Sequence, residues 1–367
     1  MPFENGSINF RMFLGNQSLP EDAHEKFLAN QAPSLDLTAD TVATGWVTGR
    51  HLLDRQIDEE TAFYGGYFRM ALLQSQRRIP TSLLKAEMQL EELVHMATTG
   101  NEYVSRRDRS EIKRGVTDRL LPQMPPTLKH TPVVHEPNSN MLYASALSEK
   151  QCDEFNAFWR HTLGYSLIPL TPETVAKERH KAETAQWYPV SFSPDVSEDL
   201  VDDVIGRDFL TWLMFYGEEK GGMISVPKVG DVGILIEGPL VFTMEGSGAH
   251  VTALRKGNPV QSAEATTCLA SGKKLSKAKL TLVIHDQVWD CTLDDQFCIR
   301  SLKLPEGEED LDNLSRFMDR MKNVGVFCEM LLGCYDEFVK VRSNRDEWKK
   351  SVEPEIHKWV KNRKSVR

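Results

Sequence analysis

The stretch TSLLKAEMQLEELVHMATT at residues 81–99, followed by RRDRSEIKRGVTDRLL at residues 106–121, predicts two consecutive helices. In both stretches apolar residues recur every three or four positions, as they do on one face of a helix. Gly100 interrupts the pattern and Pro122 ends it, because proline cannot continue a helix. We therefore expect a helical hairpin, and the segments around it decide the fold class.

Extended patterns flank this hairpin on both sides. They are rich in branched and aromatic residues, as is typical of strands. Before the hairpin they are Ile8–Leu14, Gly45–Val47 and Thr61–Leu73; after it, Thr131–His135 and Met141–Ala146 predict a β-hairpin, followed by a helix at Ser148–Leu163. Strands and helices in this order predict an α+β, multi-domain fold and not a regular βαβ alternation.

The second half of the chain predicts a smaller sheet with helices. We expect strands within 229–248, a helix at Ala263–Leu269, and a hairpin of Leu280–Ile284 with Val288–Thr292. A long helix follows, whose apolar residues between Leu314 and Phe338 repeat in heptads. Such a seam packs either on the protein's own sheet or on a second chain. For the second case, the candidate dimer contacts are four residues of the seam and one residue that follows the helical hairpin: Phe317, Met321, Val324, Leu331 and Met124.

These elements predict three domains. We expect a centre domain in two parts, a helical tip between them, a polar linker or insert, and a base domain containing the long helix. The corresponding ranges are 1–80 and 125–175 for the centre, 81–124 for the tip, 176–205 for the linker and 206–367 for the base.

Composition excludes several classes of protein. The N-terminus has no basic and apolar leader, and no apolar run is long enough to span a bilayer, so we expect no membrane association and a cytoplasmic location. Six cysteines without a CxxC pair predict buried free thiols. The net charge is -9, but basic residues are segregated from acidic stretches such as Asp195–Glu219, so the acidic total does not exclude DNA.

Motifs for catalysis are missing from the sequence. Lys273 follows Gly272, but Thr267 stands where a phosphate-binding loop requires its first glycine, and neither a Gly-x-Ser-x-Gly elbow nor a His-Glu-x-x-His motif occurs. Asp199, Asp202 and Asp203 could hold Mg²⁺ in a nuclease, although a solvated acidic surface is the simpler interpretation. We expect no catalytic residue, no metal and no cofactor.

Basic residues gather in clusters that suit phosphate contacts, which provide affinity without reading the bases. One cluster lies on the second helix of the hairpin and another on either side of the helix at Ala263–Leu269; two more arginines precede the hairpin. The candidate DNA-binding residues are Arg77, Arg78, Arg106, Arg107, Arg109, Lys113, Arg114, Arg255, Lys256, Lys273, Lys274 and Lys277.

The order of elements and several strings resemble the RdgC family of recombination-associated, double-stranded-DNA-binding proteins. The strings are Gly45-Trp46-Val47, Ile79-Pro80, Leu120-Leu121-Pro122, Ser148-Glu149-Lys150 and Leu167-Ile168-Pro169-Leu170, and the resemblance covers Ile8–Pro172. Gln123-Met124-Pro125 departs from the Arg-Ala-Phe that the family carries at the tip.

The resemblance implies centre, tip and base domains that pair as a ring-like homodimer around duplex DNA. It also implies sequence-independent binding in the nucleoid, competition with the RecA recombinase and no active site. Two alternatives stay open: a metal-dependent nuclease or nuclease partner in recombination, and a protein-interaction module that uses the heptad helix.

Overall fold

The computed structural model describes residues 3–244, 250–307 and 311–363. Residues 245–249 of the predicted strand region and residues 364–367 of the basic tail lie outside the described residues. The strands are β1 (Ile8–Gly15), β2 (Ala43–Thr48), β3 (Phe63–Tyr64), β4 (Tyr67–Arg77), β5 (Pro126–Glu136), β6 (Met141–Ala144), β7 (Leu167–Pro169), β8 (Met223–Val226), β9 (Gly230–Thr243), β10 (Val251–Leu254), β11 (Lys274–Ile284), β12 (Gln287–Asp294) and β13 (Ile299–Lys303).

The helices confirm the predicted α+β class. They are α1 (Ala23–Ala29), α2 (Glu59–Ala62), α3 (Thr81–Thr99), α4 (Arg106–Leu120), α5 (Glu149–Leu163), α6 (Pro172–His180), α7 (Ile205–Glu219), α8 (Ala263–Ala270), α9 (Asn313–Ser343), α10 (Arg345–Glu347) and α11 (Glu353–Asn362). None of the helices within the described residues combines the length and apolar character needed to cross a bilayer.

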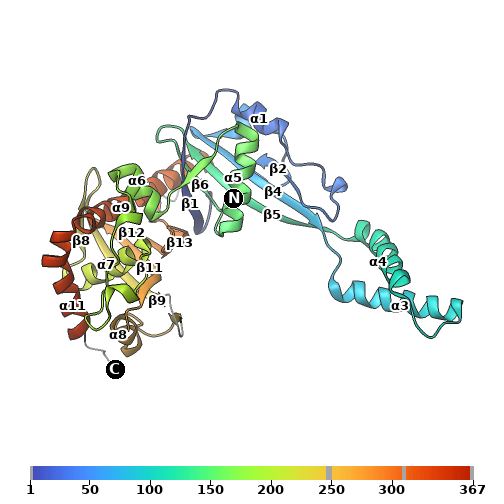
Figure 1. Cartoon of the computed structure of the whole chain (residues 1–367). Coiled ribbons are helices and arrows are strands. Elements are labelled where there is room, and N and C mark those ends of the chain that lie inside the picture. The colour runs from blue at the N-terminus through green and yellow to red at the C-terminus, as the bar shows by residue number, and fades with distance from the viewer. Residues whose placement is uncertain (1–2, 245–249, 308–310, 364–367) are drawn as a thin grey trace.

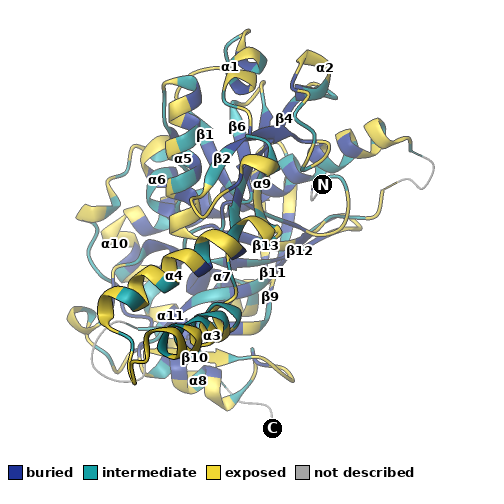
Figure 2. Ribbon diagram, turned by 90° about the vertical axis from the view of Figure 1, so that its right-hand side faces the viewer, coloured by how far each residue is buried: buried dark blue, intermediate teal, exposed yellow. Residues whose placement is uncertain are grey.

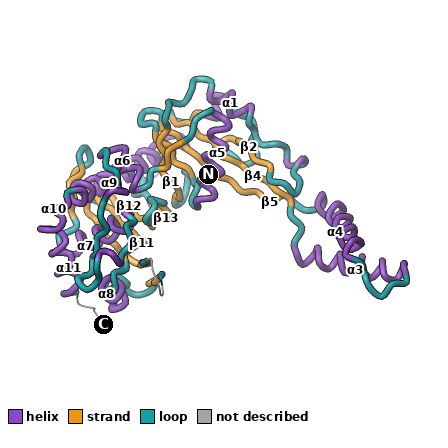
Figure 3. Tube along the Cα trace, in the orientation of Figure 1, coloured by secondary structure: helices purple, strands orange, loops and turns teal. Residues whose placement is uncertain are grey.

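One strand joins two halves of a continuous sheet. In the described residues the strand order is β10-β9-β11-β12-β13-β1-β6-β5-β4-β2. Ile8 and Phe10 of β1 pair with β13, whereas Arg11–Leu14 pair with β6. We call β2 to β6 the centre sheet and β8 to β13 the base sheet; the two occupy different parts of an arched molecule (Figures 1 and 3).

The predicted helical hairpin is confirmed and projects from the centre sheet as an arm (Figure 1). We call α3 and α4 the arm. It begins where β4 ends and β5 begins, at the paired residues Arg77 and Pro126. Helix α3 buries none of its residues and α4 buries only Val116 and Leu120, so the arm is mostly coloured exposed or intermediate in Figure 2.

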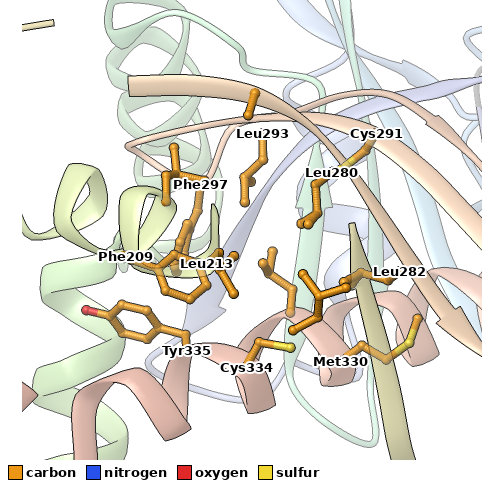
Figure 4. Close-up of a cluster of buried hydrophobic side chains, with 14 of the residues drawn as sticks. Phe209, Leu213, Leu280, Leu282, Cys291, Leu293, Phe297, Met330, Cys334 and Tyr335 are labelled. Atoms are coloured by element: carbon orange, nitrogen blue, oxygen red, sulfur yellow. The ribbon is translucent and has the colours of Figure 1, made fainter. Parts of the chain in front are cut away.

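The base sheet is covered on one side by helices that build the larger core. Phe209 and Leu213 of α7 point toward Leu280 of β11 and Leu293 of β12, with Tyr335 of α9 beside them (Figure 4). These side chains are fully buried. All six cysteines are buried and free, as the sequence predicts.

The heptad seam belongs to this core, so the prediction that it forms a dimer contact is wrong at four residues. Phe317, Met321, Val324 and Leu331 are at most 1% exposed within the single chain. The ring of Phe317 lies 5.1 Å from that of Tyr64 in β3, so α9 also connects the base to the centre. The seam is regular because it packs on the protein's own strands, and these residues are unavailable to a second chain. Met124 stays partly exposed and remains a predicted contact.

Two other segments differ from the sequence expectation. The strand predicted at Thr61–Leu73 is a short helix and a hairpin, because Gly65 and Gly66 adopt positive φ and form a turn between β3 and β4. The linker or insert expected at 176–205 contains Val190 and Phe192, which are buried in the base core. This segment therefore packs against the base and does not span freely between domains.

Candidate nucleic-acid interface

One side of the base sheet carries polar side chains, and we call it the open face. Directly opposite residues of antiparallel strands point to the same side of a sheet. The register places in one such row Glu237 of β9, Lys279 of β11, Thr292 of β12 and Arg300 of β13. All four are partly exposed, whereas Leu280, next to Lys279, and Leu293, next to Thr292, are buried in the core. Lys277 lies two residues before Lys279 on β11 and therefore shares the open face.

The open face meets the centre sheet at the start of α5. Arg300 and Arg11 each donate from Nη2 to the carbonyl oxygen of Leu147, both at 3.4 Å. Leu147 directly precedes Ser148, whose hydroxyl accepts from the backbone N–H of Gln151 and begins α5 with a capping box. Because β1 carries Arg11 and β13 carries Arg300, the two halves of the sheet share this junction.

A hollow of about 750 Å³ lies between α5 and the far ends of β2, β4 and β5, and we call it the α5 hollow. Helix α5 buries Cys152, Phe155, Trp159 and Thr162 against the sheet. The adjacent flank of the helix borders the hollow with Gln151, Glu154, Phe158 and His161, which are three or four residues apart. The opposite wall is the sheet itself, where Thr44, Gln74 and Lys129 face one another across three strands.

Cations follow this surface from the base to the arm. Arg255 and Lys279 border a second hollow of about 390 Å³ beside Glu237, and Arg78, Lys129 and Lys150 border the α5 hollow. Within 3–244, 250–307 and 311–363, no carboxylate forms an ion pair with Arg255, Lys277, Lys129 or Arg78. These four side chains can therefore neutralise an external anion without first breaking an ion pair.

Other cations on the surface are already partly neutralised. Lys279 Nζ lies 2.6 Å from Glu237 Oε2 and 3.8 Å from Asp290 Oδ2, and the hydrogen bond to Glu237 raises the pKa of Lys279 above its ordinary value. Arg300 Nη2 lies 3.6 Å from Asp294 Oδ2. These pairs are partly exposed, so each is worth little by itself and can rearrange when an anion approaches.

The predicted arm cluster lies on α4, away from the open face (Figure 1). Arg107 pairs with Glu111 at 3.2 Å and Arg109 pairs with Glu92 of α3 at 2.8 Å. Arg106, Lys113 and Arg114 are exposed and lack an ion pair within the described part of the chain. Of the five DNA-binding residues predicted on α4, three therefore have no ion pair among the described residues and two are paired with glutamates.

The predicted base cluster is divided by the structure. Arg255 and Lys256 are exposed just after β10, and Lys277 lies on the open face. Lys273 is half-buried and donates from Nζ to Thr252 Oγ1 at 2.8 Å. Arg255 and Lys277 lie on the surface that leads to the α5 hollow, and Lys256 follows Arg255 in the exposed turn.

Lys274 is wrongly predicted to contact DNA, because its side chain is fully buried. Its ammonium group lies 2.7 Å from Asp208 Oδ1 and 3.7 Å from Asp202 Oδ1. Arg342 contacts Asp208 from the other side, with Nε 3.4 Å from Oδ2. Arg207 donates to Asp202 and to Asp295, each at 2.8 Å. We call this set the buried ion cluster; it joins α7, β11 and α9 inside the base.

The buried ion cluster includes one of the three aspartates considered for a nuclease. Asp202 is buried between Arg207 and Lys274, whereas Asp199 and Asp203 are exposed. The structure's described residues contain no group of three or more His, Cys, Asp or Glu side chains arranged to hold a metal ion. Asp199, Asp202 and Asp203, which the nuclease alternative would use to hold Mg²⁺, therefore do not converge in the described residues.

Arg77 has a structural role that the sequence did not reveal. Its guanidinium donates to the carbonyl oxygens of Thr38, Pro122 and Met124, which secures the base of the arm. Its donors are thus occupied by backbone, and we withdraw Arg77 as a DNA contact. Arg78 next to it is exposed, and its Nε donates to Gln76 Oε1 at 2.7 Å.

Several cations of this surface are absent from the sequence-based candidates, among them Lys129, Lys150, Lys279 and Arg300. Lys129 lies in the part of β5 that precedes the predicted strand, where alternation with Thr127 would have placed both on the polar side of the sheet. Lys150 and Arg300 are isolated in the sequence, so no cluster marked them. Only the pairing of β1 with both β6 and β13 brings them to one surface.

Comparison with known protein families gives a match over residues 9–192, to the family model RdgC, described as "Putative exonuclease, RdgC". The matched residues include the centre sheet, the arm and the α5 hollow. A search of curated proteins finds no match to the chain.

Proposed function

The chain belongs to the RdgC family, whose model matches half of its residues, and from this premise we propose that it binds double-stranded DNA without sequence preference during homologous recombination. Family membership indicates a recombination-related DNA-binding role. The observation that carries the finer proposal is the row of unpaired cations Arg255, Lys277, Lys129 and Arg78, which follows the open face into the α5 hollow.

The proposed mechanism is neutralisation of phosphate charge. Each lysine or arginine that contacts a phosphate releases condensed counterions, so binding weakens steeply as salt concentration rises. Such contacts fix the position of the protein on the duplex and carry no sequence information. Duplex covered in this way is inaccessible to the RecA recombinase, and the protein would limit recombination by occupying DNA in the nucleoid.

We further propose a homodimer that forms through the arm. Because the heptad seam is internal, the second chain must cover a different apolar surface. Helix α3 presents Leu90, Leu93 and Val94, each more than half exposed, and Met124 lies partly exposed beyond α4. Exposed apolar side chains gathered on one element are typical of a protein interface. Two arched chains joined at their arms would enclose the duplex from both sides.

A nuclease is the second candidate, because the family description names an exonuclease. We nevertheless propose binding without cleavage, and without a metal or cofactor. Asp202 is the most buried of the three candidate aspartates, and its carboxylate is already bound by Arg207 and near Lys274. Metal binding there would require breaking both contacts inside the core.

The experiment is a gel-shift series on linear and circular duplex of unrelated sequences, with and without Mg²⁺. We expect equal affinity for all sequences, loss of binding at high salt, and intact DNA after incubation. Metal-dependent loss of labelled duplex would support the nuclease instead. Absence of any shift at low salt would favour a protein-interaction module.

A further inference from the structure

We propose that the α5 hollow binds one unpaired nucleotide unit, a base with its phosphate. The inference rests on the proposed function only for the source of that unit, which is bound DNA; a free nucleotide offers the same chemistry. At about 750 Å³ the hollow falls in the range of small-ligand pockets, roughly 300–1,000 Å³. Duplex DNA lying on the open face would present its backbone at the entrance.

The hollow has a rigid aromatic surface for stacking. Phe158 is half-buried, with its ring 5.7 Å from the fully buried ring of Trp46 and 5.8 Å from that of His161. The indole N–H of Trp46 donates to Thr162 Oγ1 at 2.8 Å, which fixes the tryptophan behind it. Bases of any sequence stack on such rings, because every base has a π-face.

The walls also offer one unused acceptor and one unused donor to the edge of a base. Gln74 uses Nε2 for Glu154, at 3.2 Å, while its Oε1 has no partner in the described part of the chain. Gln151 uses Oε1 for the capping box of α5, while its Nε2 has no partner within those residues. A carboxamide oxygen and a carboxamide nitrogen on opposite walls match the mixed donors and acceptors of a base.

Basic side chains at the rim of the α5 hollow are placed to bind the phosphate of the nucleotide. Lys129 and Arg78 have no ion pair within the described ranges, and Lys150 lies 3.7 Å from Glu154 across an exposed surface. Glu154 is the single acid among the residues that line the hollow. By contrast, the hollow of about 540 Å³ beside Trp359 is lined by Glu218 and Glu219 with Arg363, and this acidic lining disfavours a phosphate.

The test uses the full-length protein and three probes. Titration calorimetry measures binding of thymidine 5′-monophosphate, of thymidine and of inorganic phosphate. Fluorescence anisotropy compares a fully paired duplex with the same duplex carrying one extra unpaired thymidine. The variants are Gln74→Leu and Lys129→Gln, with Lys322→Gln as the control, because Lys322 is an exposed lysine on α9. Melting curves establish that every variant is folded.

We expect the monophosphate to bind better than thymidine or phosphate, and the bulged duplex to bind about tenfold more tightly than the paired one, the size of one well-made base contact. Gln74→Leu should abolish the preference for the bulge, so that bulged and paired duplex bind this variant equally. Lys129→Gln should weaken the monophosphate about tenfold, and Lys322→Gln should change nothing.

Other outcomes separate the possible sources and failures. Monophosphate binding without a bulge preference would support the site but assign it to a free nucleotide. Equal binding of phosphate and monophosphate, with no bulge preference, would overturn the nucleotide site and leave a simple anion surface. Failure to bind any duplex, with monophosphate binding intact, would refute the proposed function and not this inference.

Discussion

Replacing Lys274 with methionine tests whether this lysine stabilises the fold, unlike the exposed lysines that are proposed to bind DNA. In the folded protein its ammonium group lies 2.7 Å from Asp208 Oδ1 and 3.7 Å from Asp202 Oδ1, and all three side chains are about 1% exposed. Methionine has a similar length but no charge, so Asp208 would keep only the 3.4 Å contact to Arg342. Breaking a buried ion pair from one side costs about 3–5 kcal/mol, because a charge is left uncompensated.

For a folding unit of the size of the base, this loss corresponds to a fall in the melting temperature of about 6–20 °C. The assay is thermal melting followed by circular dichroism, with duplex affinity measured well below the melting temperature. Lys277→Met is the matched control on the same strand, since Lys277 is partly exposed and has no ion pair among the described residues. We expect the free energy of unfolding of Lys277→Met to lie within about 0.5 kcal/mol of the parent's, and its affinity for duplex to be lower.

Adding Asp208→Asn to Lys274→Met should not restore the lost stability, because the buried Arg342 would then lose its carboxylate partner. The interpretation is refuted if Lys274→Met melts like the parent and loses duplex affinity. That result would mean that Lys274 is accessible to phosphate and that the buried ion cluster is not formed.

Three further predictions concern the fold and the dimer. A β-carbon at Gly45 would lie 2.4 Å from the backbone of Ala32, so Gly45→Ala should lower the free energy of unfolding in urea by about 1–3 kcal/mol. The control Gly115→Ala, on the exposed side of α4, has open space for its β-carbon and should not lower it. Burial lowers the pKa of His135 below its ordinary value, so the stability contributed by the neutral imidazole is complete above pH 6.5 and is lost as the pH falls through the folded-state pKa. Between pH 7.5 and pH 5 the parent should therefore lose more unfolding free energy than His135→Gln. Equal losses in the two proteins would contradict this role of His135. Leu93→Glu on the arm should halve the mass measured by light scattering, while Leu37→Glu should not, although Leu37 is even more exposed and lies on the centre. A parent that is already a single chain would rule out the arm dimer.

Elements with strong local signals were predictable from the sequence. The helical spacing of residues 81–99 and 106–121 sufficed for the arm, because helix periodicity is a local property. Helix α5 was likewise predictable, with Ser148 as its cap and Phe155 and Trp159 on its buried side. The heptad seam was also detected, but its partner was not. A seam shows that a surface is covered and does not show which chain covers it.

The candidate site was only partly predictable, because it depends on contacts between distant segments. Lys274 and Lys277 look alike in the sequence, and the difference lies in Asp202 and Asp208, more than sixty residues earlier. Arg77 and Arg78 are adjacent, but only the position of Pro122 and Met124 shows that Arg77 secures the arm. Charge clusters in the sequence indicate where basic residues gather, but they do not show which of those side chains are buried in ion pairs and which are exposed to DNA.

The central claim is that duplex DNA lies along the open face and the α5 hollow, and its most direct test is the salt dependence of binding. We compare the parent with a variant in which Arg78, Lys129, Arg255 and Lys277 are all changed to glutamine. The control variant changes four exposed lysines elsewhere, Lys322, Lys350, Lys358 and Lys361. If each of the four cations contacts one phosphate, the slope of log affinity against log salt should become shallower by about 0.9 per contact, or about 3.6 in total. An unchanged slope in this variant, or an equal change in the control, would contradict the claim.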